Sequence, residues 1–371
     1  MPLTERDDGW RRLIDAAELT RFVTEALRAA GARQSDAEVT AEVLVAADLG
    51  GVESHGVARL RRYVEGLRNG DINPHAVPET VSERGSVCVL DAHNGLGQPA
   101  LREAVDIAVS RAQQFGTSTV MVRRSNHMGI AGWFAERAAR AGMLALVSTN
   151  AVPQVAPMGT NEPMFGTNPL CYAVPTTTST LCFDGATSTV SRGKLEQLDR
   201  LGEPMLKGWA LGPDGQNTTD IPETVQGLIH RKGYALLPLG GGDKNYGGHK
   251  GSAMSLLVEL LCGPLAGAQW SRHTYQNGEG GLGHFVFCLN LGALGDADTI
   301  RARVDELAQE VRAGAPTDNH APVRIPGERR HRVTDMRREG GIPVLQSVVT
   351  DLDEIAAFVG ISRVSALTYD A

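Results

Sequence analysis

Between residues 87 and 175, short runs of β-branched and aliphatic residues alternate with stretches of helical periodicity. The runs predict strands over 87–90, 119–122, 143–148 and 170–175, and the stretches between them predict helices over 98–115 and 131–141. A chain that alternates strands with helices in this way builds an α/β layer, in which helices cover a sheet.

Three polar clusters lie beside these strands, at residues 125–129 (SNHMG), 166–169 (GTNP) and 183–188 (FDGATS). Each cluster follows or precedes an apolar run, so we expect each at the end of a strand. Loops at strand ends hold chemical groups on a rigid scaffold. The sequence therefore predicts that a histidine, a carboxylate and several Gly/Asn/Pro turns meet at one site.

Both ends of the chain have helical periodicity. We expect helices over 15–30, over 35–50 with a capping box formed by Ser35 and Glu38, and from residue 57 to Gly70. Further helices are expected over 252–262, 297–311 and 347–359, and a strand over 284–291, whereas 181–251 reads as long loops and short strands. The predicted organisation is a helical domain of residues 1–78 plus 296–371 around an α/β domain of residues 79–295.

Composition excludes several classes of function. The net charge of −7 comes from interspersed charges, without the basic cluster that nucleic-acid binding needs. Five cysteines in apolar runs, with no C-x-x-C pair, indicate reduced buried thiols in a cytoplasmic protein. No run of about 18 apolar residues and no signal peptide is apparent, so no membrane association is expected. No spacing of His, Cys, Asp and Glu predicts a metal site, and no nucleophile elbow is present.

Two glycine-rich segments suggest nucleotide binding. Residues 95–100 (GLGQPA) match G-x-G-x-x-A, but they do not follow the strand directly and the next strand ends in two arginines, so a turn leading into a helix is the alternative. Residues 240–252 (GGGDKNYGGHKGS) lack the P-loop order. Their glycines, Lys250 and the free N–H groups of a helix N-terminus would suit an anion such as a pyrophosphate, and a solvated loop is the alternative.

His55 and His127 occupy similar loops, each just before a predicted helix. A helix N-terminus lowers the pKa of a histidine and a nearby carboxylate such as Asp184 raises it, so the balance suits proton transfer. Arg59 and Tyr63 follow His55 at intervals of one helical turn, which predicts a shared face where the guanidinium holds a carboxylate. A structural histidine and an ordinary surface face are the alternatives.

The ordered motifs resemble one known family, the malate/L-lactate dehydrogenases that do not have a Rossmann fold. The similar segments are ESHGVARLRRYVEGLRNGDINP, NGLGQPALREAVDIAVSRA, SNHMGIAGWFAERAARAGMLALVSTN, MFGTNPLCYAVP, FDGATSTVSRGK, HKGSAMSLLVELLCGPLAGA, PGERR and GGIPV. They extend in order over residues 13 to 360. Gly185, Met128 and the loop 271–283 depart from the family pattern, so the substrate is left open.

The resemblance implies an α/β, family-specific NAD(P)-binding fold and a homodimeric NAD- or NADP-dependent oxidoreductase. It implies that Ser54 and His55 transfer a proton, that Asp184 is their partner carboxylate, and that His127 is the proton acceptor of other members. Arg59, with Tyr63 on the face described above, would bind the substrate. The implied cofactor contacts are Thr167, Asn168, Pro169, Gly185, Ala186, Thr187, His249, Lys250, Gly327, Glu328 and Arg329.

We therefore expect hydride transfer between the nicotinamide and C2 of a small 2-oxo or 2-hydroxy acid of the malate, lactate or sulfolactate type. The alternative within the family is reduction of a cyclic imine, a piperideine- or pyrroline-2-carboxylate. A catalytically silent nucleotide-binding protein is the alternative from another class, which the joint presence of Ser54, His55, Arg59 and His127 disfavours. Which histidine carries the proton is open at this point.

Overall fold

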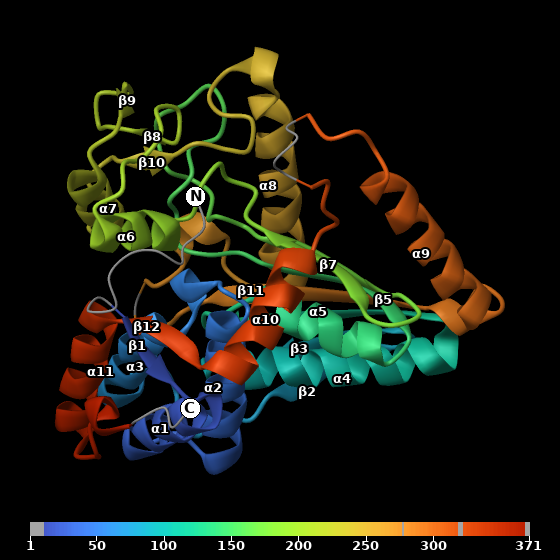
Figure 1. Ribbon diagram of the computed structural model, residues 1–371, viewed down its shortest axis with the longest axis horizontal. Helices are drawn as coiled ribbons and strands as arrows, with labels where there is room; N and C mark the ends of the chain where they lie inside the picture. The colour runs from blue at the N-terminus through green and yellow to red at the C-terminus, as the bar shows by residue number, and fades with distance from the viewer. Residues whose placement is uncertain (1–10, 277, 318–321, 368–371) are drawn as a thin grey trace. The chain divides into compact units, whose positions relative to one another are not determined.

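The computed structural model describes residues 11–276, 278–317 and 322–367 (Figure 1). The chain forms two compact units. One comprises the chain up to His75 and from Arg329 on, and the other comprises Ala76–Glu328. Residues 296–328, which we expected in the helical domain, belong to the second unit.

The first unit is mainly helical. It contains β1 (Arg11–Ile14), α1 (Ala16–Ala29), α2 (Gln34–Leu49), α3 (Leu60–Asn69), most of α10 (Glu328–Gly340), β12 (Ile342–Leu345) and α11 (Gln346–Val359). β1 pairs antiparallel with β12, so the two ends of the chain are joined by backbone hydrogen bonds. Asp15 caps α1 by accepting from the Ala17 and Glu18 N–H groups, at 2.8 and 3.0 Å.

The capping box predicted at Ser35 is wrong. α2 begins at Gln34 with Arg33 as its N-cap residue, and no side chain caps it. Ser35 is therefore already inside the helix, where its hydroxyl contacts Asp36 at 3.4 Å, and Glu38 accepts from the Gln34 side chain one turn earlier.

The second unit is built on a mixed sheet with the strand order β2-β3-β4-β11-β5-β6-β7. Its strands are β2 (Glu79–Arg84), β3 (Val87–Asp91), β4 (Thr117–Ser125), β5 (Met143–Thr149), β6 (Leu170–Pro175), β7 (Thr180–Gly185) and β11 (Leu282–Asn290). Only β3 and β4 pair in parallel. The resemblance implied a fold other than the Rossmann fold, and this strand order agrees with that expectation.

Helices α4 (Gly97–Phe115) and α5 (Ala131–Arg140) cover the sheet from below in the view of Figure 1, and α8 (Gly248–Cys262) lies above it. Alternate residues of β4, such as Val120 and Val122, are fully buried, because this face of the strand is covered. The predicted strands at 87–90, 119–122, 143–148 and 170–175 and the predicted helices at 98–115 and 131–141 are confirmed.

Residues 181–251 differ from the prediction of loops and short strands. They hold helices α6 (Arg192–Leu201) and α7 (Ile221–Ile229), which pack with the small sheet β8 (Ala210–Leu211), β9 (Asn217–Thr218) and β10 (Ala235–Leu236). Leu195, Leu198, Val225 and Leu228 form part of their common core. In the sequence, α9 (Ala297–Arg312) follows β11, near the C-terminal end of the second unit.

Candidate active site

The three polar clusters come together at one edge of the large sheet. β4 and β5 both pair antiparallel with β11, so they end on the same side, and β6 starts and β7 ends there. The pairs at this edge are Ser125 with Leu282, Thr149 with His284, Ser148 with Leu170, and Leu170 with Gly185. The predicted convergence of the clusters therefore follows from the sheet topology.

Unusual backbone conformations mark the same edge. His93, Asn94, Arg124, Asn168 and Tyr275 all have positive φ angles without being glycines. Such residues cost free energy and concentrate at functional sites, where the surrounding structure holds them in place. We take this edge as the candidate active site of the second unit.

The loop that carries His127 is fixed by its neighbour Asn126, which is 2% exposed. The Asn126 amide donates to the backbone oxygens of Asn94 and Gly95, at 3.1 and 3.0 Å, and to the Asn94 side chain at 3.0 Å. A Cβ on Gly97 would lie 2.2 Å from the Asn126 carbonyl oxygen. Gly97 therefore allows the start of α4 to approach this loop, and the interpretation of the GLGQPA segment as a turn leading into a helix holds.

The hydrogen bond at the His127 ring determines where its proton lies. The Gly129 N–H donates to Nδ1 of His127 at 3.3 Å. With Nδ1 as acceptor, a neutral imidazole carries its proton on Nε2. His127 thus presents Nε2 as a hydrogen-bond donor.

A second histidine, His284, lies fully buried at the start of β11. Its Nδ1 and Nε2 lie 2.8 Å from the hydroxyls of Thr149 and Ser125, so it links the ends of β5 and β4. Burial lowers the pKa of His284 to about 3, against a smaller opposing effect of the Asn126 backbone, so the ring is neutral. Sequence reasoning missed this residue, although a histidine within the apolar run HFVFC indicates a buried polar group.

Asp184, at the end of β7, is exposed and accepts a hydrogen bond from the Gly132 N–H at 2.7 Å. Gly132 lies in the first turn of α5, the helix that follows the His127 loop. A carboxylate is favoured there by the positive end of the helix dipole. Asp184 therefore caps α5 as well as being the predicted catalytic carboxylate.

Glu259 of α8 organises the cluster at residues 166–169. Its buried carboxylate accepts from the Gly166 N–H at 3.2 Å, the Asn168 amide at 2.8 Å and the Ser271 N–H at 2.9 Å, and also from the Ser271 hydroxyl. Sequence reasoning missed Glu259. The available signal was a single carboxylate within the apolar helical segment SLLVELL, which indicates a buried polar group.

Of the predicted cofactor contacts near Glu259, two are turned inward. Thr187 is 1% exposed and donates to the Asn168 carbonyl at 3.0 Å, and Asn168 is fully buried. These two side chains hold the loop in shape. Thr167, Pro169, Gly185 and Ala186 are partly exposed, and so remain the candidates from this region for direct contact.

The N-terminus of α8 differs from the prediction of free N–H groups. Gly248, Lys250 and Gly251 donate their N–H groups to the carbonyls of Asp243 and Gly247. A Cβ on Gly251 would lie 2.0 Å from the Leu239 carbonyl oxygen, so this glycine serves close packing within the segment. The His249 and Lys250 side chains are exposed at the start of the helix, where the dipole favours an anion.

The segment at residues 327–329 is divided between the two units. Gly327 packs against the backbone of β7, and Glu328 binds the Ile325 N–H at 2.9 Å and Arg312. Burial would raise the pKa of Glu328, but these two partners outweigh it and the pKa is lowered. Arg329 belongs to the first unit and is exposed.

In the first unit, Ser54 and His55 lie on one short turn, with the Ser54 hydroxyl 2.9 Å from Nδ1 of His55. Arg59 lies on a second turn and donates from Nε to the Ser54 carbonyl at 2.7 Å. The predicted single helix face is wrong, because Gly56 is extended between the two turns and Tyr63 is fully buried on α3.

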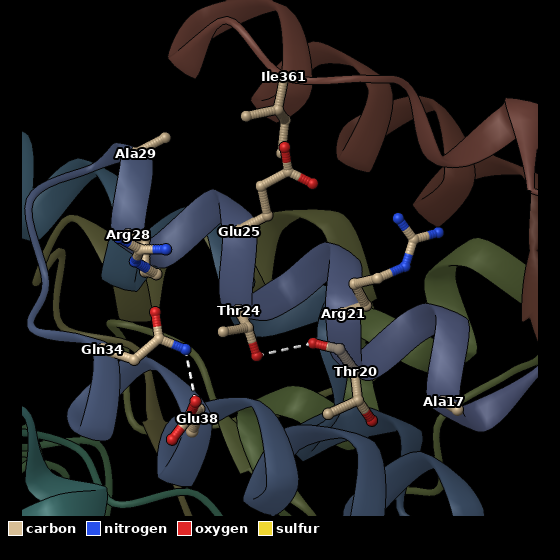
Figure 2. Close-up of a pocket in the computed structure, with 10 residues that line it drawn as sticks. All are labelled: Ala17, Thr20, Arg21, Thr24, Glu25, Arg28, Ala29, Gln34, Glu38 and Ile361. Atoms are coloured by element: carbon tan, nitrogen blue, oxygen red, sulfur yellow. Dashed lines mark hydrogen bonds between the residues drawn. The ribbon is translucent and has the colours of Figure 1, made fainter.

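A cavity of the first unit lies elsewhere, between α1, α2 and residue Ile361 (Figure 2). Its polar side chains include Thr24, which donates to the Thr20 backbone, and Gln34, which donates to Glu38. It contains none of the predicted site residues. In the described part of the chain, no cluster of His, Cys, Asp or Glu could hold a metal ion and no helix could span a membrane.

The exposed residues of the second unit fit a dinucleotide in their chemistry. Lys250 and His249 offer donors for a pyrophosphate. At the end of β7, Ala186 has a small side chain, whereas the Phe183 ring takes up the space beside Gly185, 2.7 Å from where a Cβ on Gly185 would lie.

Comparison with known proteins agrees with this picture. A family described as malate/L-lactate dehydrogenase matches residues 14–353. The malate dehydrogenase of Pyrococcus abyssi is 38% identical, over 96% of this chain and 97% of its own. The Δ1-pyrroline-2-carboxylate reductase of Ancylobacter novellus is 33% identical, over 92% and 97%. The crystal structure of malate dehydrogenase from Entamoeba histolytica is 30% identical and superimposes with a TM-score of 0.91, over 95% of this chain and 99% of that one.

Proposed function

Because the chain belongs to the malate/L-lactate dehydrogenase family, we propose that it is an NAD(P)-dependent oxidoreductase of 2-oxo and 2-hydroxy acids. In the reducing direction a hydride adds to C2 of the acid and a proton adds to the C2 oxygen, which gives the 2-hydroxy acid. The nicotinamide supplies the hydride when bound. The substrate class is that of malate, lactate and sulfolactate.

The two histidines receive different roles from their hydrogen bonds. The partner of His127 Nδ1 is a backbone N–H, which can only donate, so an imidazolium at this position would lose that bond. The partner of His55 Nδ1 is the Ser54 hydroxyl, which can donate or accept. His55 can therefore gain and lose a proton without losing its partner. This observation carries the proposal: His55, assisted by Ser54, transfers the proton, and His127 donates a hydrogen bond to the C2 oxygen.

The remaining residues bind and orient. Arg59 is proposed to hold the substrate carboxylate through its guanidinium, of which Nε is already fixed by the Ser54 carbonyl. This contact ties the substrate ligand to the proton-transfer residue. Asp184 is proposed as the partner carboxylate of the proton-transfer chemistry. Its bond to Gly132 fixes the position of the carboxylate, because the Gly132 N–H belongs to the first turn of a helix.

The test measures oxidation of NADH and of NADPH with pyruvate, oxaloacetate, 3-sulfopyruvate, 2,3-diketogulonate and piperideine-2-carboxylate. Turnover of a linear 2-oxo acid supports the proposal and identifies the distal group, and the ratio of the two cofactors' kcat/KM identifies the preferred one. Turnover of the cyclic imine alone would assign the chain to the alternative that its similarity to a pyrroline-2-carboxylate reductase favours. Cofactor binding without turnover of any of these would contradict both.

A His55→Ala variant and a His127→Ala variant separate the two roles. We expect His55→Ala to remove the pH dependence of kcat together with most of the activity. His127→Ala should lower kcat and leave the shape of the pH profile unchanged. The reverse pattern would exchange the two assignments, and an unchanged kcat in both would refute them.

We further propose that the chain works in the cytoplasm as a homodimer, with the helical first unit contributing to dimerisation and substrate binding and the second unit binding the cofactor. The five cysteines are buried free thiols, as in proteins of reducing compartments. Sedimentation equilibrium at several concentrations tests the dimer, and a monomer at all of them would refute it.

A further inference from the structure

Asp48 is a buried carboxyl group directly beneath the turn that carries Ser54 and His55. It lies near the end of α2 and is only 5% exposed. Its Oδ2 accepts a hydrogen bond from the Val57 N–H at 2.7 Å. A residue of one helix is thus bonded to the segment that immediately follows His55.

Gly56 allows this approach. A Cβ at Gly56 would lie 1.9 Å from Oδ1 and 2.2 Å from Cγ of Asp48. The backbone of Gly56 is extended, with φ −86° and ψ −150°, so its conformation does not itself require glycine. Residue 56 is therefore restricted to glycine by the Asp48 carboxyl, which occupies the space that a side chain next to His55 would need.

The turn is held from other sides as well. Arg337 of α10 donates to the Asp48 carbonyl oxygen and, at 2.6 Å, to the Glu53 carboxylate. Arg11 of β1 lies 3.6 Å from the same carboxylate. Three elements of the first unit, β1, α2 and α10, thus converge on the turn at residues 53–57.

The charge state of Asp48 follows from these surroundings. Burial raises its pKa to about 8; the Val57 N–H lowers it, the neighbouring Glu53 raises it and Arg337 lowers it. At neutral pH the buried group is therefore largely an uncharged carboxylic acid. As pH rises through 8, the group ionises, and a buried anion beside Glu53 favours conformations in which the turn lifts and water reaches the carboxylate.

We propose that Asp48 is a positioning residue for His55, which sets the height and orientation of the Ser54–His55 turn through the Val57 N–H and the contact with Gly56. This inference rests on the proposed role of His55 in proton transfer. Asp48 itself touches no reacting atom. Its effect is on kcat, because a displacement of about 1 Å in a catalytic group costs roughly 10²-fold in rate.

The first experiment compares Asp48→Ala, Asp48→Asn and a matched control, Asp36→Ala. Asp36 lies on the same helix and is buried to a similar degree, 8% exposed, but it bonds to Arg33 and not to the turn. We expect Asp48→Ala to lower kcat by roughly 10²-fold with the Kd of the cofactor unchanged. Asp48→Asn should restore most of kcat, because its amide oxygen can accept the Val57 N–H. Asp36→Ala should leave kcat unchanged.

The second experiment uses the pH profile, which a merely structural role would not alter. In addition to the pH dependence that His55 itself produces, the wild-type kcat should decline further above about pH 8, where Asp48 ionises, and Asp48→Asn should lack this further decline. The profile needs only the Asn variant, so it decides the matter even if Asp48→Ala does not fold. A pH profile of Asp48→Asn that is identical to that of the wild type would overturn the proposal, and so would a wild-type kcat in a folded Asp48→Ala.

The third experiment tests the contact between Gly56 and the Asp48 carboxyl. Gly56→Ala should lower kcat, and Gly56→Ala combined with Asp48→Ala should regain part of it, since the clashing carboxyl is gone; no regain would contradict the contact. His55→Ala is measured alongside. If it keeps full kcat, the role of His55 fails, whereas loss in His55→Ala with none in Asp48→Ala overturns only the role of Asp48.

Discussion

The Glu259 carboxylate offers the sharpest test of how the second unit holds its polar edge. Four donors from two separate loops converge on it: the Gly166 N–H, the Asn168 amide, and the N–H and hydroxyl of Ser271. Three of them share Oε1, and the Ser271 N–H alone meets Oε2. We consider Glu259→Gln and Glu259→Ala, which remove the charge and the whole group respectively.

The two variants differ in how many donors lose an acceptor. In Glu259→Gln the amide oxygen can take the place of Oε1, so the three hydrogen bonds to Oε1 remain but are made to a neutral acceptor. The Ser271 N–H alone then faces an NH₂ group and has no acceptor. One orphaned donor costs about 1–3 kcal/mol. In Glu259→Ala all four donors lose their partner. A loss of about 3–5 kcal/mol is expected, because removal of one member of a buried charged network has a cost of this size.

Urea denaturation gives the free energy of unfolding of each variant, and steady-state kinetics give KM for the cofactor. We expect the order wild type, Gln, Ala in stability. In the Ala variant KM should rise, because Asn168, with its φ of +41°, loses the contact that holds it in this conformation. If Glu259→Ala lost less than about 0.5 kcal/mol, the range of an ordinary surface substitution, the reasoning would be refuted.

Three further predictions follow from the same geometry. His284 has its pKa lowered from 6.5 to about 3, so the unfolded chain takes up the proton first; the free energy of unfolding should fall by up to ~5 kcal/mol as pH falls across this window, and His284→Gln should flatten the slope measured by urea denaturation. Gly251→Ala places a Cβ 2.0 Å from the Leu239 carbonyl and should lower Tm by an amount equivalent to about 1–3 kcal/mol, whereas Gly340→Ala, which meets no atom within 4 Å, should not; equal Tm values would contradict the packing. Asp184→Asn should cost only about 0.3–1 kcal/mol of stability, the value of a charge at a helix N-terminus, while lowering kcat far more; a parallel loss of both would leave Asp184 as a helix cap alone.

The central part of the fold was predictable because its strands and helices carry their periodicity locally. The run TVMV is rich in β-branched residues and bounded by polar residues, and it became the core of β4. The segment 98–115 has its apolar residues on one side and became α4. The secondary structure of each of these elements is determined by its own side chains, which place the apolar residues on the one face that the rest of the unit covers.

Elements stabilised by distant partners were not predictable in this way. α10 has no buried residue, and its sequence ERRHRVTDMRREG has no apolar stripe; Arg337 attaches it to the first unit through Asp48 and Glu53. β1 is four residues long and pairs with β12, more than 300 residues away. The N-cap residues Ser191 of α6 and Asp220 of α7 are typical of helix starts. The many Gly, Thr and Asp residues around them favoured the prediction of loops over these helices.

The polar clusters of the site were visible as residues, but their division of labour was not. Sequence spacing cannot distinguish Thr187, whose hydroxyl is turned inward, from its neighbour Ala186 at the surface. Nor can it reveal that Gly56 is extended and separates His55 from Arg59. These properties depend on backbone conformation and burial, which arise only when the whole unit has formed.

The pairing of β1 with β12 also sets a limit on when this protein can finish folding during its synthesis. β12 follows β1 by about 330 residues, which a ribosome needs roughly 15–70 s to add at about 5–20 residues per second. In the same way β11, which joins β4 to β5, arrives only after three quarters of the chain. The nascent chain therefore exposes the unpaired edges of β1, β4 and β5 until late in translation, a period in which chaperone binding would protect it from aggregation.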